Sequence, residues 1–121
     1  YGKIIFFDIS AEWCAPCKLL AKETEETQHD YESQGFMYIT MIAEDNNTAP
    51  PETDVLVRWA EEAGILSAPV VGPSADLRST LHPINTPYPR LMLIDRNMKI
   101  INGDIQPQND ATIRAAIEAA L

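Results

Sequence analysis

Apolar and polar positions along the chain fall into blocks that predict alternating strands and helices. An apolar run over residues 3–9 predicts a strand buried on both faces. Residues from about 15 to 33 predict a helix with an unusually polar second half. Pro16 suits the first turn of this helix, and no helix-breaking residue follows it in this range. Residues 36–43 are rich in Met, Tyr, Ile and Thr and predict a second strand.

The second half of the chain continues the alternation with shorter elements. A polar, proline-bearing loop over residues 44–52 precedes an amphipathic helix from Thr53 to Ala63, with Thr53 as its cap and Trp59 in its apolar stripe. The remaining expected elements are a short strand at 69–71, a short helix over about 75–81 capped by Ser74, a hairpin of strands 90–95 and 98–102 that turns at Arg96-Asn97, and a last helix capped by Asn109 or Asp110. Strands that alternate with helices imply a sheet that is parallel in its first part, to which the late hairpin adds an antiparallel edge. We therefore expect a single α/β domain over residues 1–121 with a mixed central sheet.

Composition and charge exclude several classes of function. The 121 residues suffice for one ordinary hydrophobic core. Although 45% of the residues are hydrophobic, the apolar runs are far shorter than the ~20 residues that span a bilayer. A net charge of −9 argues against a nucleic-acid partner. The chain starts at Tyr1, and no basic and apolar leader precedes the first strand, which indicates a piece trimmed from a longer exported or membrane-anchored chain. We expect membrane contact only through such a missing anchor.

The two cysteines of the chain, Cys14 and Cys17, stand one helical turn apart at the predicted start of the first helix. A helix N-terminus favours a thiolate and lowers a cysteine pKa from about 8.5 into a range of roughly 3.5 to 7.5. A structural disulfide over so short a loop would add little stability, and a zinc site needs about four ligands. The two histidines, His29 and His82, are distant in sequence and are expected to be surface or turn residues. A redox-active dithiol without metal or cofactor is the leading hypothesis.

Two segments resemble the thioredoxin-like superfamily. Residues 7–18 (FDISAEWCAPCK) are similar to the thioredoxin active-site segment, and residues 88–95 (YPRLMLID) resemble the stretch in which a cis-proline faces the dithiol. The additional helix and strand around residues 53–71 make the chain most similar to the TlpA and ResA group of bacterial thiol-disulfide oxidoreductases. One departure is Ser10, which stands where thioredoxin has a second tryptophan.

The resemblance implies a three-layer thioredoxin-like fold with flanking helices and an inserted helix-strand segment. It also implies an extracytoplasmic enzyme, in the periplasm or cell envelope, that takes electrons from an upstream thiol donor and passes them to a disulfide-bearing protein substrate. Pro16 between the cysteines resembles the reducing members of the superfamily more than its strong oxidants. We therefore expect a protein-disulfide reductase.

The same resemblance implies roles for individual residues. Cys14 attacks a substrate disulfide and Cys17 resolves the mixed disulfide. Asp8, on a buried strand beneath the dithiol, is expected to have a pKa raised by desolvation and to take a proton from Cys17. The residues expected to bind substrate are Trp13, Ala15, Pro16, Tyr88 and Pro89. Glu44, or its neighbour Asp45, and Lys18 are candidates for tuning the thiols, although Lys18 is equally well explained as a solvated helix residue.

Two other classes of function stay open at this point. Peroxiredoxin-like thiol peroxidases share the fold and a similar insertion, but they usually have a Thr three residues before the reactive cysteine, where this chain has Ala11. A non-enzymatic peptide-binding or metallochaperone-like module would use the groove beside Tyr88 and Pro89 and would not need both cysteines. Reduction of a protein disulfide separates these classes.

Overall fold

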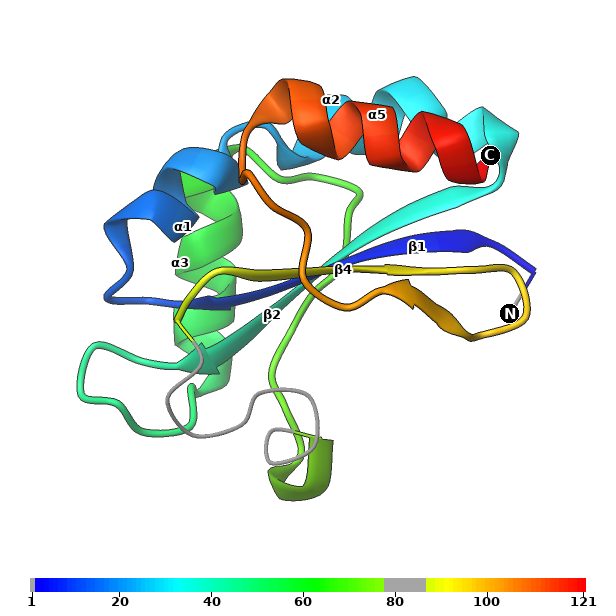
Figure 1. The fold of residues 1–121 in the computed structure, drawn as a ribbon. Helices are drawn as coiled ribbons and strands as arrows, with labels where there is room; N and C mark the ends of the chain where they lie inside the picture. Colours follow the sequence, from blue (N-terminus) through cyan, green and yellow to red (C-terminus); the bar gives the residue numbers. More distant parts are fainter. Residues whose placement is uncertain (1, 78–86) are drawn as a thin grey trace.

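A five-stranded mixed sheet forms the centre of the protein, as seen in a computed structural model that describes residues 2–77 and 87–121 (Figure 1). The strands are β1 (Ile4–Ala11), β2 (Phe36–Glu44), β3 (Val70–Val71), β4 (Arg90–Ile94) and β5 (Ile100–Asn102), in the spatial order β3-β2-β1-β4-β5. β1, β2 and β3 are parallel, whereas β4 runs antiparallel to β1 and β5 antiparallel to β4. The predicted α/β class and mixed sheet are confirmed.

The helices pack around this sheet, with α2 and α5 side by side along one edge of the view (Figure 1). Their bounds are α1 (Ala15–Ala21), α2 (Thr24–Tyr31), a 3-10 turn η1 (Glu32–Gln34), α3 (Thr53–Ala63) and α5 (Asp110–Ala120). Residues 75–77 are also helical, and the Ser74 hydroxyl accepts a 3.1 Å hydrogen bond from the Leu77 amide, as expected of a cap. The rest of the helix predicted over 75–81 lies outside the described residues, as does His82. None of the helices in the described ranges is long and apolar enough to cross a bilayer.

The core has two parts because successive strand residues point to opposite faces of the sheet. The larger cluster combines strand residues such as Phe6 and Tyr38 with Cys17 of α1, Trp59 of α3 and Ile117 of α5. The smaller cluster lies on the opposite face and consists of Ile9, Met41, Ala43 and Met92, with Phe7 and Tyr88 packed against it. The predicted core position of Trp59 is confirmed, since only 5% of it is exposed.

The single helix predicted over residues 15–33 is wrong in detail, because two helices fill this range. The Glu23 amide bonds to the carbonyl of Leu20, three residues back, and this tighter turn separates α1 from α2. The acidic part of α2 is also more than a solvated face. The Glu25 carboxylate accepts hydrogen bonds from the backbone amides of residues 66, 67 and 68, in the connection between α3 and β3.

Two local predictions about turns and caps are corrected as well. The residue that caps α3 is Glu52, and Thr53 is the first helical residue. The β4–β5 turn spans Asp95 to Lys99 and is wider than the two-residue turn predicted at Arg96-Asn97, because that dipeptide has no glycine for a tight hairpin turn. Met98 instead takes the left-handed conformation, with φ of 64°. Of the two predicted caps of α5, Asn109 is the one whose side chain accepts the Thr112 amide, at 2.8 Å.

Arg96 ties together the end of the sheet that lies opposite α1. Its guanidinium donates hydrogen bonds to the carbonyls of Gly2, Gln34 and Gly35. Gly35 has φ of 81°, and a Cβ on it would lie 2.6 Å from the Arg96 side chain. Glycine is therefore favoured at position 35 by its left-handed backbone conformation, and a larger residue would also displace the end of the Arg96 side chain.

Candidate active site

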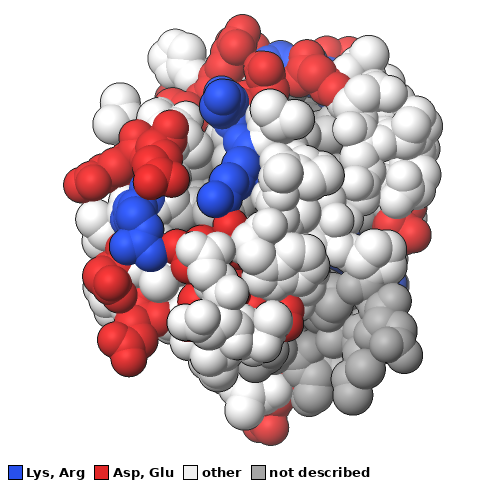
Figure 2. Space-filling view, turned by 90° about the vertical axis from the view of Figure 1, so that its left-hand side faces the viewer, with Lys and Arg blue, Asp and Glu red and all other residues white. Residues whose placement is uncertain are grey.

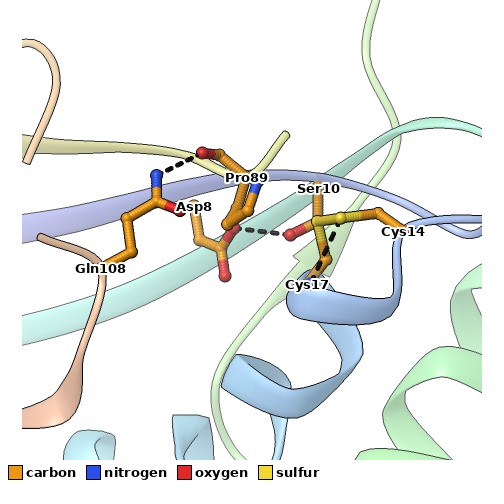
Figure 3. Close-up of a disulfide and its surroundings, with 6 residues drawn as sticks. All are labelled: Asp8, Ser10, Cys14, Cys17, Pro89 and Gln108. Carbon is orange, nitrogen blue, oxygen red and sulfur yellow. Dashed lines mark hydrogen bonds between the residues drawn. A yellow bond between two sulfur atoms is a disulfide. The ribbon is translucent and has the colours of Figure 1, made fainter. Parts of the chain in front are cut away.

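The two cysteines lie at the junction of β1 and α1 and form a disulfide (Figure 3). Cys14 is the N-cap of α1, and the backbone amide of Cys17 donates a 3.2 Å hydrogen bond to its sulfur. Pro16 lies in the first turn, where a residue without an N–H is tolerated. The positive end of the helix and the Cys17 amide both favour negative charge on Cys14 Sγ when the disulfide is open. The structure thus places the dithiol where the sequence predicts it.

Exposure of the two sulfur-bearing residues follows the expected order, although the difference is small. Cys14 is 3% exposed and Cys17 is fully buried. Ala15 and Pro16, between them, are exposed, and so is Lys18, immediately after Cys17. A partner that reaches the disulfide therefore meets Cys14 first.

Asp8 lies on β1 near the disulfide, and its side chain is fully buried (Figure 3). Desolvation raises its pKa from 3.8 to about 6, while hydrogen bonds from Ser10 and Tyr38 oppose the rise. The Ser10 hydroxyl donates to Oδ1 at 2.6 Å, and the Tyr38 hydroxyl donates to Oδ2 at 3.3 Å. The predicted direction of the Asp8 shift is confirmed. A carboxyl group with a pKa near neutrality can accept and return a proton at physiological pH.

The aromatic side chains beside the disulfide come from two distant segments. Trp13 is 48% exposed and contacts the ring of Tyr88 edge-on, with ring centroids 5.6 Å apart. The Tyr88-Pro89 peptide bond is cis, and Pro89 is buried next to the start of β4. The sequence predicted Trp13, Tyr88 and Pro89 as one site, and the fold brings Trp13 and Tyr88 into contact.

Gln108 is a residue of this region that the sequence did not indicate. Its side-chain amide donates a 2.6 Å hydrogen bond to the carbonyl oxygen of Pro89 (Figure 3). Gln108 lies in the loop between β5 and α5, where neither periodicity nor a motif marks it. This bond ties the loop between β5 and α5 to the segment that carries Tyr88 and Pro89.

Glu12, directly before Trp13, is the second residue that the sequence analysis did not single out. It is 7% exposed, its carboxylate accepts a 2.9 Å hydrogen bond from the Asn46 amide, and it forms a 2.5 Å ion pair with Arg58 of α3. The dithiol loop is therefore tied to the inserted helix. Glu44, the predicted tuning residue, is paired with Ala11 in the sheet, and Asp45 accepts the amides of the turn that follows. A thiol-tuning role for Glu44 or Asp45 stays a prediction.

No metal site is formed by the part of the chain that the structure describes, since no three His, Cys, Asp or Glu side chains gather there. The His29 side chain is 81% exposed and lies 3.6 Å from Glu32. His29 is thus a surface residue, as predicted.

Comparison with known proteins agrees with this geometry. No protein-family model matches the sequence. A thioredoxin from Buchnera aphidicola subsp. Baizongia pistaciae is 40% identical over 48 residues, a match that spans 40% of this chain and only 44% of that thioredoxin. The structure is similar to a thiol:disulfide interchange protein of the thioredoxin family from Chlorobium tepidum TLS, with a TM-score of 0.78 and 21% identity over 98% of this chain and 80% of the other. It is also similar to an exposed lipoprotein thioredoxin from Streptococcus pneumoniae strain TIGR4, with a TM-score of 0.76 and 19% identity over 98% of this chain and 85% of that one.

The chain therefore has the thioredoxin-like fold that the sequence predicted. Its inserted segment consists of α3 and β3, and β3 adds a parallel strand beside β2.

Proposed function

We propose that this chain is a thiol-disulfide oxidoreductase that reduces disulfides of protein substrates through Cys14 and Cys17. The observation that carries the proposal is the Cys14–Cys17 disulfide at the N-terminus of α1, next to a buried carboxyl group with a pKa of about 6. A short ring at a helix terminus can open and close with little change elsewhere. Such a pair is suited to exchange electrons rather than to hold the fold together.

The reaction begins with the dithiol form of the chain. The Cys14 thiolate attacks one sulfur of the substrate disulfide, the substrate S–S bond breaks, and its second sulfur leaves as a thiolate that takes a proton from water. Cys17 then attacks Cys14 Sγ, which breaks the mixed disulfide and releases the other substrate sulfur. The substrate has gained two electrons and two protons, and the chain holds the Cys14–Cys17 disulfide until a donor dithiol reduces it.

Asp8 acts in the second step as a general base. The buried Cys17 thiol must lose its proton as it becomes a nucleophile, and a deprotonated Asp8 accepts that proton directly or through water. A carboxyl group with an ordinary pKa would be a weaker base. Burial of Asp8 therefore supports its assignment to this role.

Substrate binding is assigned to the surface around Cys14. Trp13 offers an exposed aromatic face, Ala15 and Pro16 are exposed between the cysteines, and Tyr88 packs against Trp13. We assign an extended substrate segment to the surface beside Tyr88 and Pro89. A peptide strand that crosses this surface brings its disulfide to Cys14.

The direction of electron flow and the cellular location belong to the same proposal. Pro16 between the cysteines supports reduction as the physiological direction, with an upstream thiol donor. One similar solved structure is described as an exposed lipoprotein thioredoxin, which supports an extracytoplasmic location for this chain as well.

Reduction of insulin disulfides with dithiothreitol as electron donor tests the proposal. The unaltered chain should accelerate precipitation of the insulin B chain well above the dithiothreitol background, and Cys14→Ser should return the rate to background. An equal rate with Cys14→Ser, or no rate with the unaltered chain, would exclude the oxidoreductase. Consumption of hydrogen peroxide under the same conditions would instead indicate the thiol peroxidase.

The substrate itself can be identified by trapping. Cys17→Ser removes the resolving thiol, so the mixed disulfide should accumulate on Cys14 and be visible on a non-reducing gel. Cys14→Ser with Cys17 intact is the matched control and should trap far less.

A further inference from the structure

A small cavity of about 200 Å³ lies between α1 and α3, away from the aromatic surface around Cys14. It is lined by Lys18, Ala21, Lys22, Trp59, Glu62 and Ala63. This volume is below the roughly 300–1,000 Å³ that is usual for small-molecule and cofactor sites. It suits a single side chain of a binding partner better than a cofactor.

The wall that α3 contributes includes a buried donor without an acceptor. Trp59 is only 5% exposed, and its indole N–H has no hydrogen-bond partner among the residues that the structure describes. Tryptophan N–H groups usually find an acceptor when they are buried, because an unpaired donor is costly. The indole nitrogen itself has almost no accessible surface, so Trp59 lines the cavity with other atoms and can report on its occupancy.

The α1 side of the cavity carries two cations. Lys18, in α1, and Lys22, the C-cap of α1, are exposed, stand four residues apart and have no ion pair within residues 2–77 and 87–121. Like charges at this spacing repel one another. By contrast, each arginine that the structure describes donates a side-chain hydrogen bond.

The wider surface makes these two lysines unusual. The chain has a net charge of −9, and Figure 2, which shows the α1 and α3 side, has a few basic side chains set among acidic ones. Glu62 lines the same cavity but is not within ion-pair distance of either lysine. The cavity is therefore flanked by two charged donors within an otherwise acidic surface.

We propose that the cavity between α1 and α3 binds an acidic side chain of the disulfide-bearing protein partner. This inference rests on the proposed function and adds a preference among its substrates. A carboxylate offers only acceptors, so it matches the two ammonium groups. No neutral side chain would satisfy the two lysines equally well.

The position of the cavity predicts where the acidic residue lies in the partner. With a rise of 1.5 Å per residue, Lys18 and Lys22 lie about 6 and 12 Å from Cys14 along the helix. An extended peptide advances about 3.3 Å per residue and covers these distances in about two to four residues. The favoured partner therefore carries Asp or Glu about two to four residues from its reacting cysteine.

Synthetic peptides test this prediction. Each peptide carries one cysteine in a disulfide with a 2-pyridyl sulfur, and either Glu or Gln at the second, third or fourth position from that cysteine. Attack by Cys14 on the peptide sulfur releases 2-thiopyridone, whose absorbance gives the rate. At the best position we expect the Glu peptide to react about fivefold faster than its Gln counterpart, the effect of one or two partly exposed ion pairs.

Variants assign the preference to the cavity. In Lys18→Gln/Lys22→Gln the ratio of the Glu to the Gln rate should fall to about one. The matched control is Lys3→Gln/Lys99→Gln, which removes the same charge from two other exposed lysines and should keep the ratio. A ratio of one or less in the unaltered chain, or an equal loss in the control, would overturn the proposal.

Binding without reaction separates this inference from the proposed function. The chain has two tryptophans, so the Trp59 indole N–H signal in a ¹H–¹⁵N spectrum can be assigned by its loss in Trp59→Phe. The signal should shift with the Glu peptide, in a form without the pyridyl sulfur, and not with the Gln peptide. A shift of the signal without disulfide reduction would support the carboxylate site and exclude the oxidoreductase. Disulfide reduction without a shift would support the oxidoreductase and exclude the carboxylate site. Saturation by acetate alone at the same concentration would reject a protein partner as the source of the carboxylate.

Discussion

The hydroxyl of Ser10 donates a 2.6 Å hydrogen bond to Oδ1 of Asp8, and both residues are fully buried on β1. In the resemblance to the thioredoxin active-site segment, Ser10 takes the position of a second tryptophan, which puts a polar donor beside the buried acid. This bond stabilises the charged form of Asp8 and limits the pKa rise that desolvation causes. Ser10 is therefore a positioning residue for the predicted base.

Ser10→Ala should raise the pKa of Asp8 above its value of about 6, because it removes a hydrogen bond that lowers it. The pH profile of kcat/KM for disulfide reduction should then shift to higher pH, and stability should fall by about 1 kcal/mol through the lost hydrogen bond. Ser33→Ala, in the exposed 3-10 turn, is the control. An unchanged pH profile would show that Ser10 has only a structural role.

Asp8→Asn should stabilise the protein at neutral pH while slowing the reaction. Because burial raises the pKa of Asp8 from 3.8 to about 6, the folded state keeps a proton that the unfolded chain has released, and stability falls as pH rises through this interval. The full rise corresponds to roughly 3 kcal/mol. Urea unfolding should show a gain up to that size above pH 7 and little difference near pH 4. Resolution of the mixed disulfide by Cys17 should be slower.

Gln108→Ala should weaken substrate binding without altering the dithiol. Loss of the 2.6 Å bond to the Pro89 carbonyl frees the segment that carries Tyr88 and costs about 1 kcal/mol of stability. We expect KM for a peptide disulfide to rise several-fold, with an unchanged rate of Cys14 alkylation. Gln34→Ala, at an exposed position, is the matched variant. If both variants give the same KM, the role assigned to Gln108 is wrong.

Arg58→Met should destabilise the fold because it leaves the nearly buried Glu12 carboxylate without its cation. The additional change Glu12→Gln should recover part of the loss, since it removes the charge and keeps an acceptor for the Asn46 amide. Urea midpoints of the two single variants and the double variant form a cycle that measures the coupling. Additive effects would show that the two side chains do not stabilise each other.

Glu25→Gln should destabilise the protein at neutral pH and not at low pH. Desolvation raises the pKa of Glu25, but the hydrogen bonds from residues 66 to 68 outweigh this rise, and the pKa is lower than its ordinary value. The ionised carboxylate thus contributes stability that is present above its unfolded pKa and is lost as pH falls through the folded pKa. The difference in urea midpoint between the variant and the unaltered chain should shrink from pH 7 to pH 3. Glu26→Gln, on the exposed side of α2, is the control.

The elements around the dithiol could be predicted because their signals are local. An apolar run, Pro16 in a first helical turn and two cysteines three residues apart act within a short stretch of chain. The contacts that the sequence did not reveal connect distant positions. Glu12 and Arg58 are 46 residues apart, and Gln108 and Pro89 are 19 apart. Neither hydrophobic periodicity nor a short motif contains information on such pairs.

The break between α1 and α2 was missed for a related reason. The residues that face the core before and after it, such as Cys17 and Thr24, keep helical spacing across the turn. The spacing of the core-facing residues therefore predicts one continuous helix. Only the backbone bond from Glu23 to Leu20 shows the interruption.

Arg96 and the carbonyls that it binds lie at the end of the sheet away from the dithiol. Arg96 fixes the carbonyl of Gly2 at the start of β1, whereas the dithiol follows the other end of this eight-residue strand, a separation of about 26 Å. The N-terminal end and α1 lie on opposite sides of the molecule (Figure 1). Partners that approach Cys14 therefore meet the side of the molecule opposite the contacts of Arg96.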